Sequence, residues 1–264
     1  FMSTYNLLLS IYCLYFIKNL GLTMNTLTIG GDGDIGAALT SLLAKDPANY
    51  KNFATSRRAE PPKDAEADAE ITWLPLDLAS KRSIKTATQH LGSSCSSLDL
   101  IVFASGYLHG DNGDPEKGMK EIESSNLIHS YLVNTVGPLL FFKDSIKLIK
   151  SAKRPIVVFL SAQVGSIEDN RTGGWYSYRM AKAALNMAVK NLALECSRMP
   201  NKPIVVAVHP GTTATKLSKP FLKHRKAVPS EPIDTASAIL RLVDGLQTSD
   251  SGKFLTTSGK TLPW

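Results

Sequence analysis

The chain has 264 residues, of which 43% are hydrophobic, and a formal net charge of +7. This length and composition allow a full hydrophobic core within one domain, and no internal repeat or low-complexity tract divides the chain. The basic residues are scattered except between Lys216 and Lys226, and no nucleic-acid-binding motif is present. Nucleic acid is therefore not an expected partner.

Cysteines and histidines give no sign of a disulfide framework or a metal site. The three cysteines lie far apart, and the five histidines lack the spacing of metal ligands. A sparse, odd set of cysteines suits a reducing compartment. We therefore expect a cytoplasmic protein that uses no metal.

The first 23 residues stand apart from the rest. Their apolar run, Leu7 to Ile17, is shorter than a bilayer-spanning helix and lacks the basic flank of a secretory signal. Met24 comes immediately before the first expected strand. We interpret residues 1–23 as a non-native or mis-assigned leader, with a membrane-associating anchor as the alternative, and residues 24–264 as the functional domain.

Strand and helix patterns alternate along the chain. Strands are expected near residues 26, 52, 72, 99, 156, 204 and 254. Long helices are expected over residues 126–150, before Pro155, and over residues 176–199, ended by Pro200. The alternation predicts a single α/β domain, with a doubly wound parallel sheet of about seven strands and helices on both faces.

A glycine-rich turn joins the first strand, Thr26 to Ile29, to a helix that begins near Ala37. Three of its glycines satisfy G-x-G-x-x-G, and they are Gly31, Gly33 and Gly36. Such a turn lets a pyrophosphate approach the backbone, where free N–H groups and the helix dipole stabilise its charge. The turn therefore predicts dinucleotide binding, with a plain surface turn as the alternative.

Tyr178 and Lys182 lie one helical turn apart within the long helix expected over residues 176–199. Side chains at this spacing share a helix face, with about 5 to 6 Å between their Cβ atoms. An ammonium there favours the phenolate and is expected to lower the tyrosine pKa from about 10 toward neutral pH. The pair predicts proton transfer, with an amphipathic tyrosine beside a solvated lysine as the alternative.

Together, these motifs resemble the short-chain dehydrogenase/reductase family, and the resemblance extends over residues 25–264. Residues 165–178 and the ending at Trp264 are most similar to the C-factor-like subgroup, relatives of small carbonyl reductases. The resemblance implies a Rossmann fold, a dinucleotide cofactor and reduction of a small-molecule carbonyl substrate. We also expect a homo-oligomer.

The resemblance implies four catalytic residues, which are Asn134, Ser161, Tyr178 and Lys182. Asn134 matches a helix asparagine that supports a proton-relay water. The family's catalytic serine stands three residues before a glycine, and counting back from Gly165 reaches Ala162, one position after Ser161. Successive strand residues face opposite sides of a sheet, so this offset would point Ser161 away from the substrate. Either a bulge re-aims Ser161, or the site works without this hydroxyl.

The cofactor is expected to be NADP(H). Arg57 and Arg58 follow the second strand, where arginine pairs with a 2′-phosphate; a solvated loop is the alternative. The resemblance adds an acidic residue near the adenine and a proline-glycine turn that closes over the nicotinamide. The expected cofactor-binding residues are Gly30, Gly31, Gly33, Ile35, Gly36, Arg57, Arg58, Asp77, Leu78, Ala104, Gly106, Tyr178, Lys182, Pro210, Gly211 and Thr213.

Two positions depart from the family. Asp34 replaces a fingerprint glycine, and we expect its carboxylate to cap the helix that follows. The Asn-Ala-Gly that usually follows the fourth strand is here Ala104, Ser105 and Gly106, so a side-chain contact is missing.

We therefore expect an NADPH-dependent oxidoreductase that reduces a ketone or aldehyde, with Tyr178 as general acid. A dinucleotide-binding regulatory or signalling protein with weak or vestigial catalysis is the alternative. The basic run from Lys216 to Lys226 is interpreted as either a solvated loop or a substrate lid.

Overall fold

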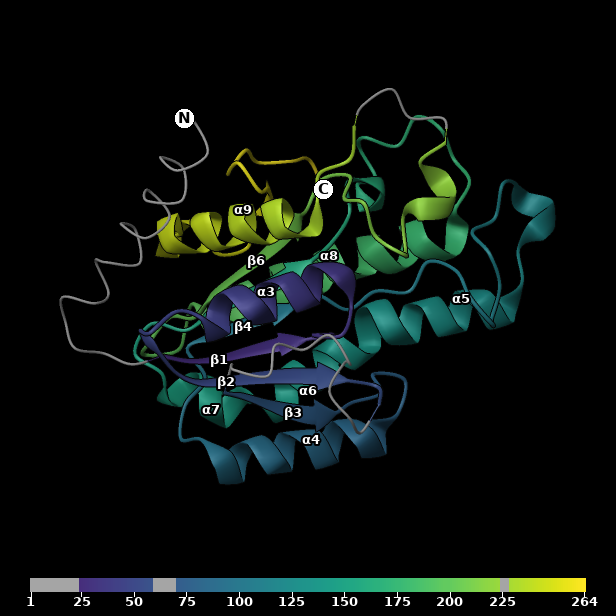
Figure 1. The fold of residues 1–264 in the computed structure, drawn as a ribbon. Coiled ribbons are helices and arrows are strands. Elements are labelled where there is room, and N and C mark those ends of the chain that lie inside the picture. Colours follow the sequence, from purple (N-terminus) through teal and green to yellow (C-terminus); the bar gives the residue numbers. More distant parts are fainter. Residues whose placement is uncertain (1–23, 59–69, 224–227) are drawn as a thin grey trace, which may run out of the picture.

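The computed structural model describes residues 24–58, 70–223 and 228–264 (Figure 1). The predictions made for residues 1–23 and for residues 224–226 lie outside this part of the chain. Within it, the strands form one sheet in the order β3-β2-β1-β4-β5-β6-β7, and every neighbouring pair is parallel. The strands are β1 (Met24–Ile29), β2 (Asn49–Ser56), β3 (Ile71–Pro75), β4 (Leu100–Phe103), β5 (Ile156–Leu160), β6 (Ile204–His209) and β7 (Phe254–Thr256).

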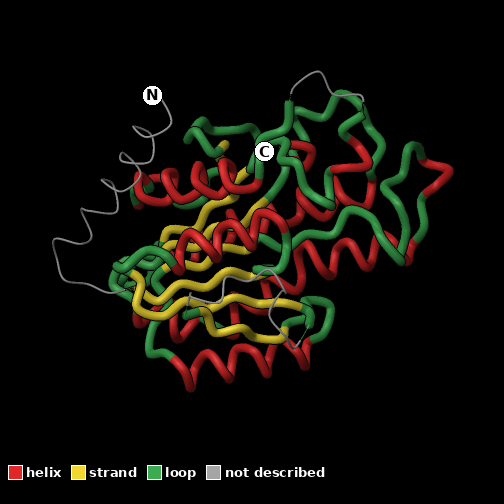
Figure 2. The backbone as a smooth tube through the Cα atoms, viewed as in Figure 1, coloured by secondary structure: helices red, strands yellow, loops and turns green. Residues whose placement is uncertain are grey.

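Helices cover both faces of the sheet, as Figure 2 shows, and one or more of them follow each strand from β3 to β6 as well as β1. The α-helices are α3 (Asp34–Ala44), α4 (Lys81–Ser94), α5 (Ser124–Tyr131), α6 (Gly137–Asp144), α7 (Ile146–Ser151), α8 (Tyr176–Cys196) and α9 (Pro232–Gly245). The short helices are η1 (Met119–Glu121), η2 (Leu132–Val136), η3 (Gln163–Gly165), η4 (Lys219–Phe221) and η5 (Thr248–Asp250). The predicted doubly wound α/β domain is confirmed.

The core lies on the two sides of the sheet because strand side chains alternate in direction. On one side, Val102 and Val158 pack with residues of α3 and α9. On the other side, Phe103 and Phe159 stack with ring centroids 4.3 Å apart, and residues of α4, α6, α7 and α8 cover them. Every strand of the sheet centre is therefore buried on both faces, as its continuous apolar sequence requires.

Strand order reverses beside β1, because β2 continues the sheet in one direction and β4 in the other. In open α/β sheets, ligands bind outside the carboxyl ends of the strands at such a switch point. The glycine-rich turn follows β1 at this place, and the loop from residue 104 follows β4. The fold therefore brings the two segments together at the predicted cofactor site.

The long helix expected over residues 126–150 is interrupted. The helix α5 is followed directly by the π-helix η2, which contains Asn134, and α6 follows η2. Pro138 has no N–H to donate to the carbonyl of Asn134, four residues earlier, so the α-helical ladder cannot continue there. A side chain at Gly137 would also collide with the carbonyl of Leu78, 2.3 Å from its Cβ position.

Candidate active site

The turn after β1 is shaped so that only glycine fits at two positions. Gly30 has φ +79°, and a Cβ there would lie 2.9 Å from the backbone of Ser105. A Cβ on Gly36 would lie 1.9 Å from the carbonyl oxygen of Gly30. These close approaches bring the start of α3 against the turn, and no side chain caps that helix end. Its N–H groups therefore face the place where the sequence predicts a pyrophosphate.

Asp34 does not cap α3, so that expectation is wrong. The N-cap residue is Gly33, and Asp34 is the first residue of the helix. Its carboxylate instead accepts a hydrogen bond from the backbone N–H of Lys216, with 2.6 Å between Oδ2 and N. Asp34 thus joins the phosphate-binding turn to the segment after β6, which we call the lid segment (residues 210–223).

A groove of about 440 Å³ extends from this turn to Tyr178. The predicted cofactor residues that line it are Gly30, Gly33, Ile35, Arg57, Asp77, Leu78, Ala104, Gly106, Tyr178, Lys182 and Pro210. Five predicted residues do not line it, and they are Gly31, Gly36, Arg58, Gly211 and Thr213. Gly31 faces β2, donating its N–H to the carbonyl of Thr55 at 2.8 Å, whereas Gly211 and Thr213 line the neighbouring cavity described below.

Asp32 is a groove residue that the sequence analysis missed. Its carboxylate accepts a hydrogen bond from the hydroxyl of Ser56, the last residue of β2, at 3.1 Å. Arg57 lines the same groove directly after that strand. The end of β2 therefore combines a cation, Arg57, with a nearby carboxylate, Asp32. The position of Asp32 inside the glycine-rich turn was the sequence signal that could have identified it.

Tyr178 and Lys182 lie on one face of α8, as predicted. Both are buried, with exposed fractions of 8% and 3%. The ammonium of Lys182 lies 5.6 Å from the centroid of the Tyr178 ring and donates a hydrogen bond to the carbonyl of Leu160 at 2.9 Å. The lysine is thus held between the end of β5 and the tyrosine.

Burial sets the protonation of this pair. It lowers the pKa of Lys182 to about 8 and raises the pKa of Tyr178 above its ordinary value. The expected lowering of the tyrosine pKa is therefore wrong for the protein alone, because desolvation of the phenolate outweighs the ammonium, which hydrogen-bonds elsewhere. At neutral pH Tyr178 carries its proton, as a proton donor must.

Asn134 uses its side chain to fasten the loop after β4. Its Nδ2 donates to the carbonyl of Tyr107 at 2.8 Å, and its Oδ1 accepts from the N–H of Tyr107 at 3.1 Å. Nδ2 also donates to the carbonyl of Ser130 at 3.0 Å. The amide of the side chain is thus engaged within the protein, and Pro138 has no N–H to donate to the backbone carbonyl of Asn134.

Ser161 is buried, and its hydroxyl donates to Oδ1 of Asn186, one turn beyond Lys182 on α8, at 2.7 Å. The next residue, Ala162, is partly exposed and lines the cavity beside Tyr178. Ser161 lines this cavity too, as well as the groove, and the pairing of β5 with β6, which ends at Leu160, contains no bulge. The structure brings Ser161 to the site, but with its hydroxyl bound to α8.

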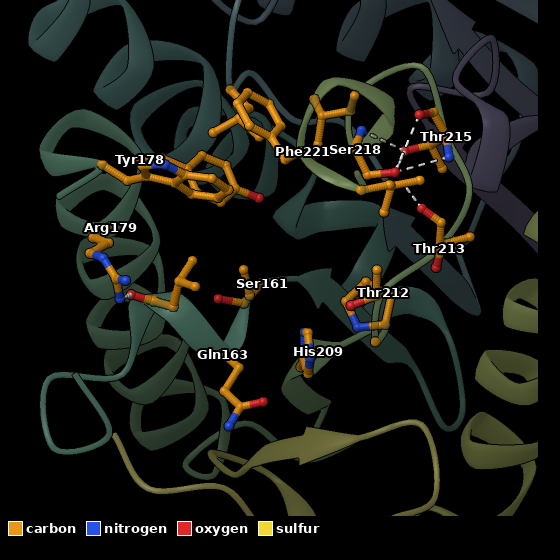
Figure 3. Close-up of a pocket in the computed structure, with 18 of the residues that line it drawn as sticks. Ser161, Gln163, Tyr178, Arg179, His209, Thr212, Thr213, Thr215, Ser218 and Phe221 are labelled. Carbon is orange, nitrogen blue, oxygen red and sulfur yellow. Dashed lines mark hydrogen bonds between the residues drawn. The ribbon is translucent and has the colours of Figure 1, made fainter. Parts of the chain in front are cut away.

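A second cavity of about 350 Å³ lies under the lid segment, next to the groove. Trp175 and Phe221 form part of its wall, with ring centroids 5.0 Å apart, and Phe221 also contacts the ring of His109 at 5.7 Å. Nε2 of His109 lies 3.1 Å from the carbonyl of Leu217, within hydrogen-bond distance. Figure 3 shows Tyr178 and Phe221 on one side of this cavity and Ser161, Gln163 and His209 on the other.

Described residues of the basic run line this cavity, namely Leu217, Ser218, Phe221 and Leu222, and their role as a substrate lid stays a prediction. Asp34 holds one side of the segment and His109 the other. The sequence did not identify Trp175, Phe221 or His109 as site residues, because they come from three segments far apart in the chain.

The sequence of residues 25–226 matches the short chain dehydrogenase family. The chain belongs to this family. An uncharacterized oxidoreductase of Schizosaccharomyces pombe is 25% identical over 250 residues, which cover 89% of this chain and 96% of the relative. The C-signal protein of Myxococcus xanthus is 30% identical over 144 residues, which cover 54% of this chain and 82% of the relative.

Among solved structures, the NADPH-bound carbonyl reductase from chicken fatty liver has a similar fold. The TM-score is 0.81 at 23% sequence identity, and the match covers 92% of this chain and 95% of that one. The predicted resemblance to short-chain dehydrogenases, with a C-factor-like relative, is confirmed, and the carbonyl reductase shares the fold.

Two features are absent from the described part of the chain, a metal-binding cluster and a membrane-spanning helix. Across residues 24–58, 70–223 and 228–264, no group of three or more His, Cys, Asp or Glu side chains is arranged to hold a metal ion. Within the same ranges no helix has the length and apolar character needed to cross a membrane.

Proposed function

We propose that this oxidoreductase uses NADPH to reduce a ketone or an aldehyde, with Tyr178 as the general acid. The observation that carries the proposal is the position of Tyr178, which lines both the groove and the cavity under the lid segment. A group at this junction can contact a cofactor on one side and a carbonyl compound on the other. Burial keeps its proton in place at neutral pH.

The groove fits a dinucleotide. Its glycine turn would hold the pyrophosphate against the start of α3, and Asp77 and Leu78 would flank the adenine. Lys182 would contact the ribose, and Pro210 would lie against the nicotinamide. When bound, the cofactor supplies the hydride.

Arg57 is the residue that favours NADPH over NADH in this proposal. Its guanidinium can pair with a 2′-phosphate through charge-assisted hydrogen bonds, whereas a 2′-hydroxyl offers no charge to pair with. The NADPH found in the carbonyl reductase of similar fold supports the same choice. Asp32 favours NADH instead, because its carboxylate lies at the end of β2, where it would repel a 2′-phosphate.

The protein's own groups account for the proton. Tyr178 would donate its hydroxyl proton to the carbonyl oxygen as that oxygen gains negative charge. The Lys182 ammonium, 5.6 Å from the tyrosine ring, would stabilise the phenolate that remains. The backbone carbonyl of Asn134 would hold a water through which the proton is replaced.

A regulatory or signalling role with weak catalysis is the second candidate, and one observation favours it. Ala162 occupies the place of the family serine, and the hydroxyl of Ser161 is bound to Asn186. The substrate oxygen would then accept a hydrogen bond from one hydroxyl, that of Tyr178, rather than from two. Such a site orients its substrate less firmly and turns over more slowly.

Steady-state NADPH oxidation against a panel of ketones and aldehydes tests the proposal. Fluorescence titration with NADPH serves as the control, because it reports binding without turnover. Turnover that depends on the carbonyl compound supports a reductase. Tight NADPH binding without turnover for any compound would favour the regulatory role, and absence of binding would contradict both.

A further inference from the structure

The helix that carries Tyr178 begins without a cap of its own. Its N-cap residue, Trp175, has φ +51° and forms no side-chain capping hydrogen bond. Gly173 and Gly174 before it also have positive φ, +63° and +65°. A non-glycine residue rarely adopts this conformation, so other contacts must hold Trp175 there.

Glu116 supplies those contacts from the loop between β4 and α5. Its backbone carbonyl accepts the N–H of Trp175 at 2.5 Å. Its Oε2 accepts both the N–H and the hydroxyl of Ser177, each at 3.0 Å. A side chain 61 residues away along the chain thus satisfies an N–H group in the first turn of α8.

The carboxylate is buried, with 1% of Glu116 exposed. Its remaining oxygen, Oε1, accepts from Nδ2 of Asn126 at 3.0 Å, so each of its three donors is uncharged. The carboxylate also lies at the positive end of the α8 dipole, because it accepts an N–H from the first turn of that helix. A buried carboxylate is costly without such partners, which makes a role in fixing the helix start the natural explanation.

These contacts fix the chain from Trp175 to Tyr178. Trp175 forms the cavity wall with Phe221, and Tyr178 lies next along the chain, with its ring centroid 6.4 Å from that of Trp175. The network continues to the helix of Asn134, because the Ser130 hydroxyl donates to the carbonyl of Ser177 at 3.1 Å.

We infer that Glu116 is a positioning residue: its carboxylate fixes the first turn of α8 and so places the Tyr178 hydroxyl and the Trp175 wall relative to the substrate. This inference rests on the proposed reductase function. Glu116 lines neither cavity, so it acts through Ser177 and Trp175 rather than on the substrate.

The experiment compares Glu116→Ala and Glu116→Gln with Glu121→Ala as the matched control. Glu121 lies in the same loop, is exposed and accepts only the N–H of Lys117, at 2.8 Å. For Glu116→Ala we expect kcat to fall at least tenfold while the Kd for NADPH stays within twofold of the wild type. Gln keeps one acceptor oxygen and should recover part of kcat, and Glu121→Ala should match the wild type.

Hydrogen exchange of residues 175–182 separates this inference from the proposed function. Loss of protection in Glu116→Ala, with a fall in kcat at constant NADPH affinity, supports a positioning role. Unchanged protection or an unchanged kcat overturns it. If the wild type turns over no carbonyl, the proposed function fails, whereas exchange still shows whether Glu116 fixes α8. If Glu116→Ala does not fold, the same comparison is made between Glu116→Gln and Ser177→Ala.

Discussion

The groove and the cavity under the lid segment meet at Tyr178 but are built differently. The groove is made largely of backbone at the carboxyl ends of strands, where Gly30 and Gly36 permit close approach. The cavity is lined by side chains such as Gln163, Trp175 and Phe221, which come from separate segments of the chain. In the proposed function, a bound cofactor would therefore depend on the close approach that the glycine turn permits, whereas a bound substrate would depend on the side chains of the cavity.

The largest effect on cofactor binding is expected from the arginines that follow β2. Replacing Arg57 and Arg58 together by alanine should weaken NADPH binding about 10- to 100-fold, because charge-assisted hydrogen bonds contribute about 1.5 to 3 kcal/mol each. NADH binding should change little. Isothermal titration with both cofactors measures the difference, and equal losses would mean that the arginines have a structural role.

Asp32→Asn is the complementary variant at the same place. It removes the carboxylate near the end of β2 but retains an acceptor for the hydroxyl of Ser56. It should therefore raise the preference for NADPH in the same titration. A shift toward NADH would contradict the placement of the 2′-phosphate.

The next prediction concerns whether Ser161 or Ala162 faces a substrate in the cavity. Ala162→Ser should raise kcat by about tenfold, because it adds a hydrogen-bond donor beside Tyr178. Ser161→Ala should leave kcat within about twofold, since that hydroxyl is already bound to Asn186. Turnover with a shared carbonyl substrate is measured for both. A large loss in Ser161→Ala alone would show that Ser161 leaves Asn186 to act in catalysis.

Local patterns were enough to predict the sheet, the glycine turn and the pairing of Tyr178 with Lys182. Each of these depends on residues a few positions apart, whose geometry the strand or helix period fixes. Asp34 was misjudged because its partner, the N–H of Lys216, lies 182 positions away. Glu116 gave no signal, because its role depends on a contact with Ser177 across the fold.

The tyrosine pKa was misjudged for a related reason. The spacing of Tyr178 and Lys182 shows which charge is near, but it does not show how deeply both groups are buried. Desolvation, which depends on the whole packed structure, decides the direction of the shift.

Asp34 links the groove to the lid segment, and its replacement should change NADPH binding less than the loss of the arginines. Asp34→Asn removes a negative charge from the start of α3 while keeping an oxygen that can accept the N–H of Lys216. NADPH should bind several-fold more tightly, because the carboxylate no longer repels the pyrophosphate. Asp34→Ala, which also releases the lid segment, is the control for the hydrogen bond. Weaker NADPH binding in Asp34→Asn would contradict this electrostatic account.

A further prediction concerns stability rather than cofactor binding. Because burial lowers the pKa of Lys182 to about 8, from 10.5, the unfolded chain binds more protons than the folded protein between those pH values. The free energy of unfolding of the wild type should therefore rise with pH across this window, relative to Lys182→Met. The difference is bounded at about 3 kcal/mol. Urea unfolding at pH 7.5 and pH 10 measures it, and parallel pH profiles would show that the lysine is not desolvated.

The central claim is that one buried tyrosine at the junction of the groove and the cavity supplies the proton. Its most direct test measures NADPH oxidation and NADPH affinity together in Tyr178→Phe, which removes one hydroxyl and little contact area. We predict a loss of at least about a hundredfold in kcat, with the Kd for NADPH nearly unchanged. Turnover near the wild-type rate would contradict the account, because another group would then protonate the substrate.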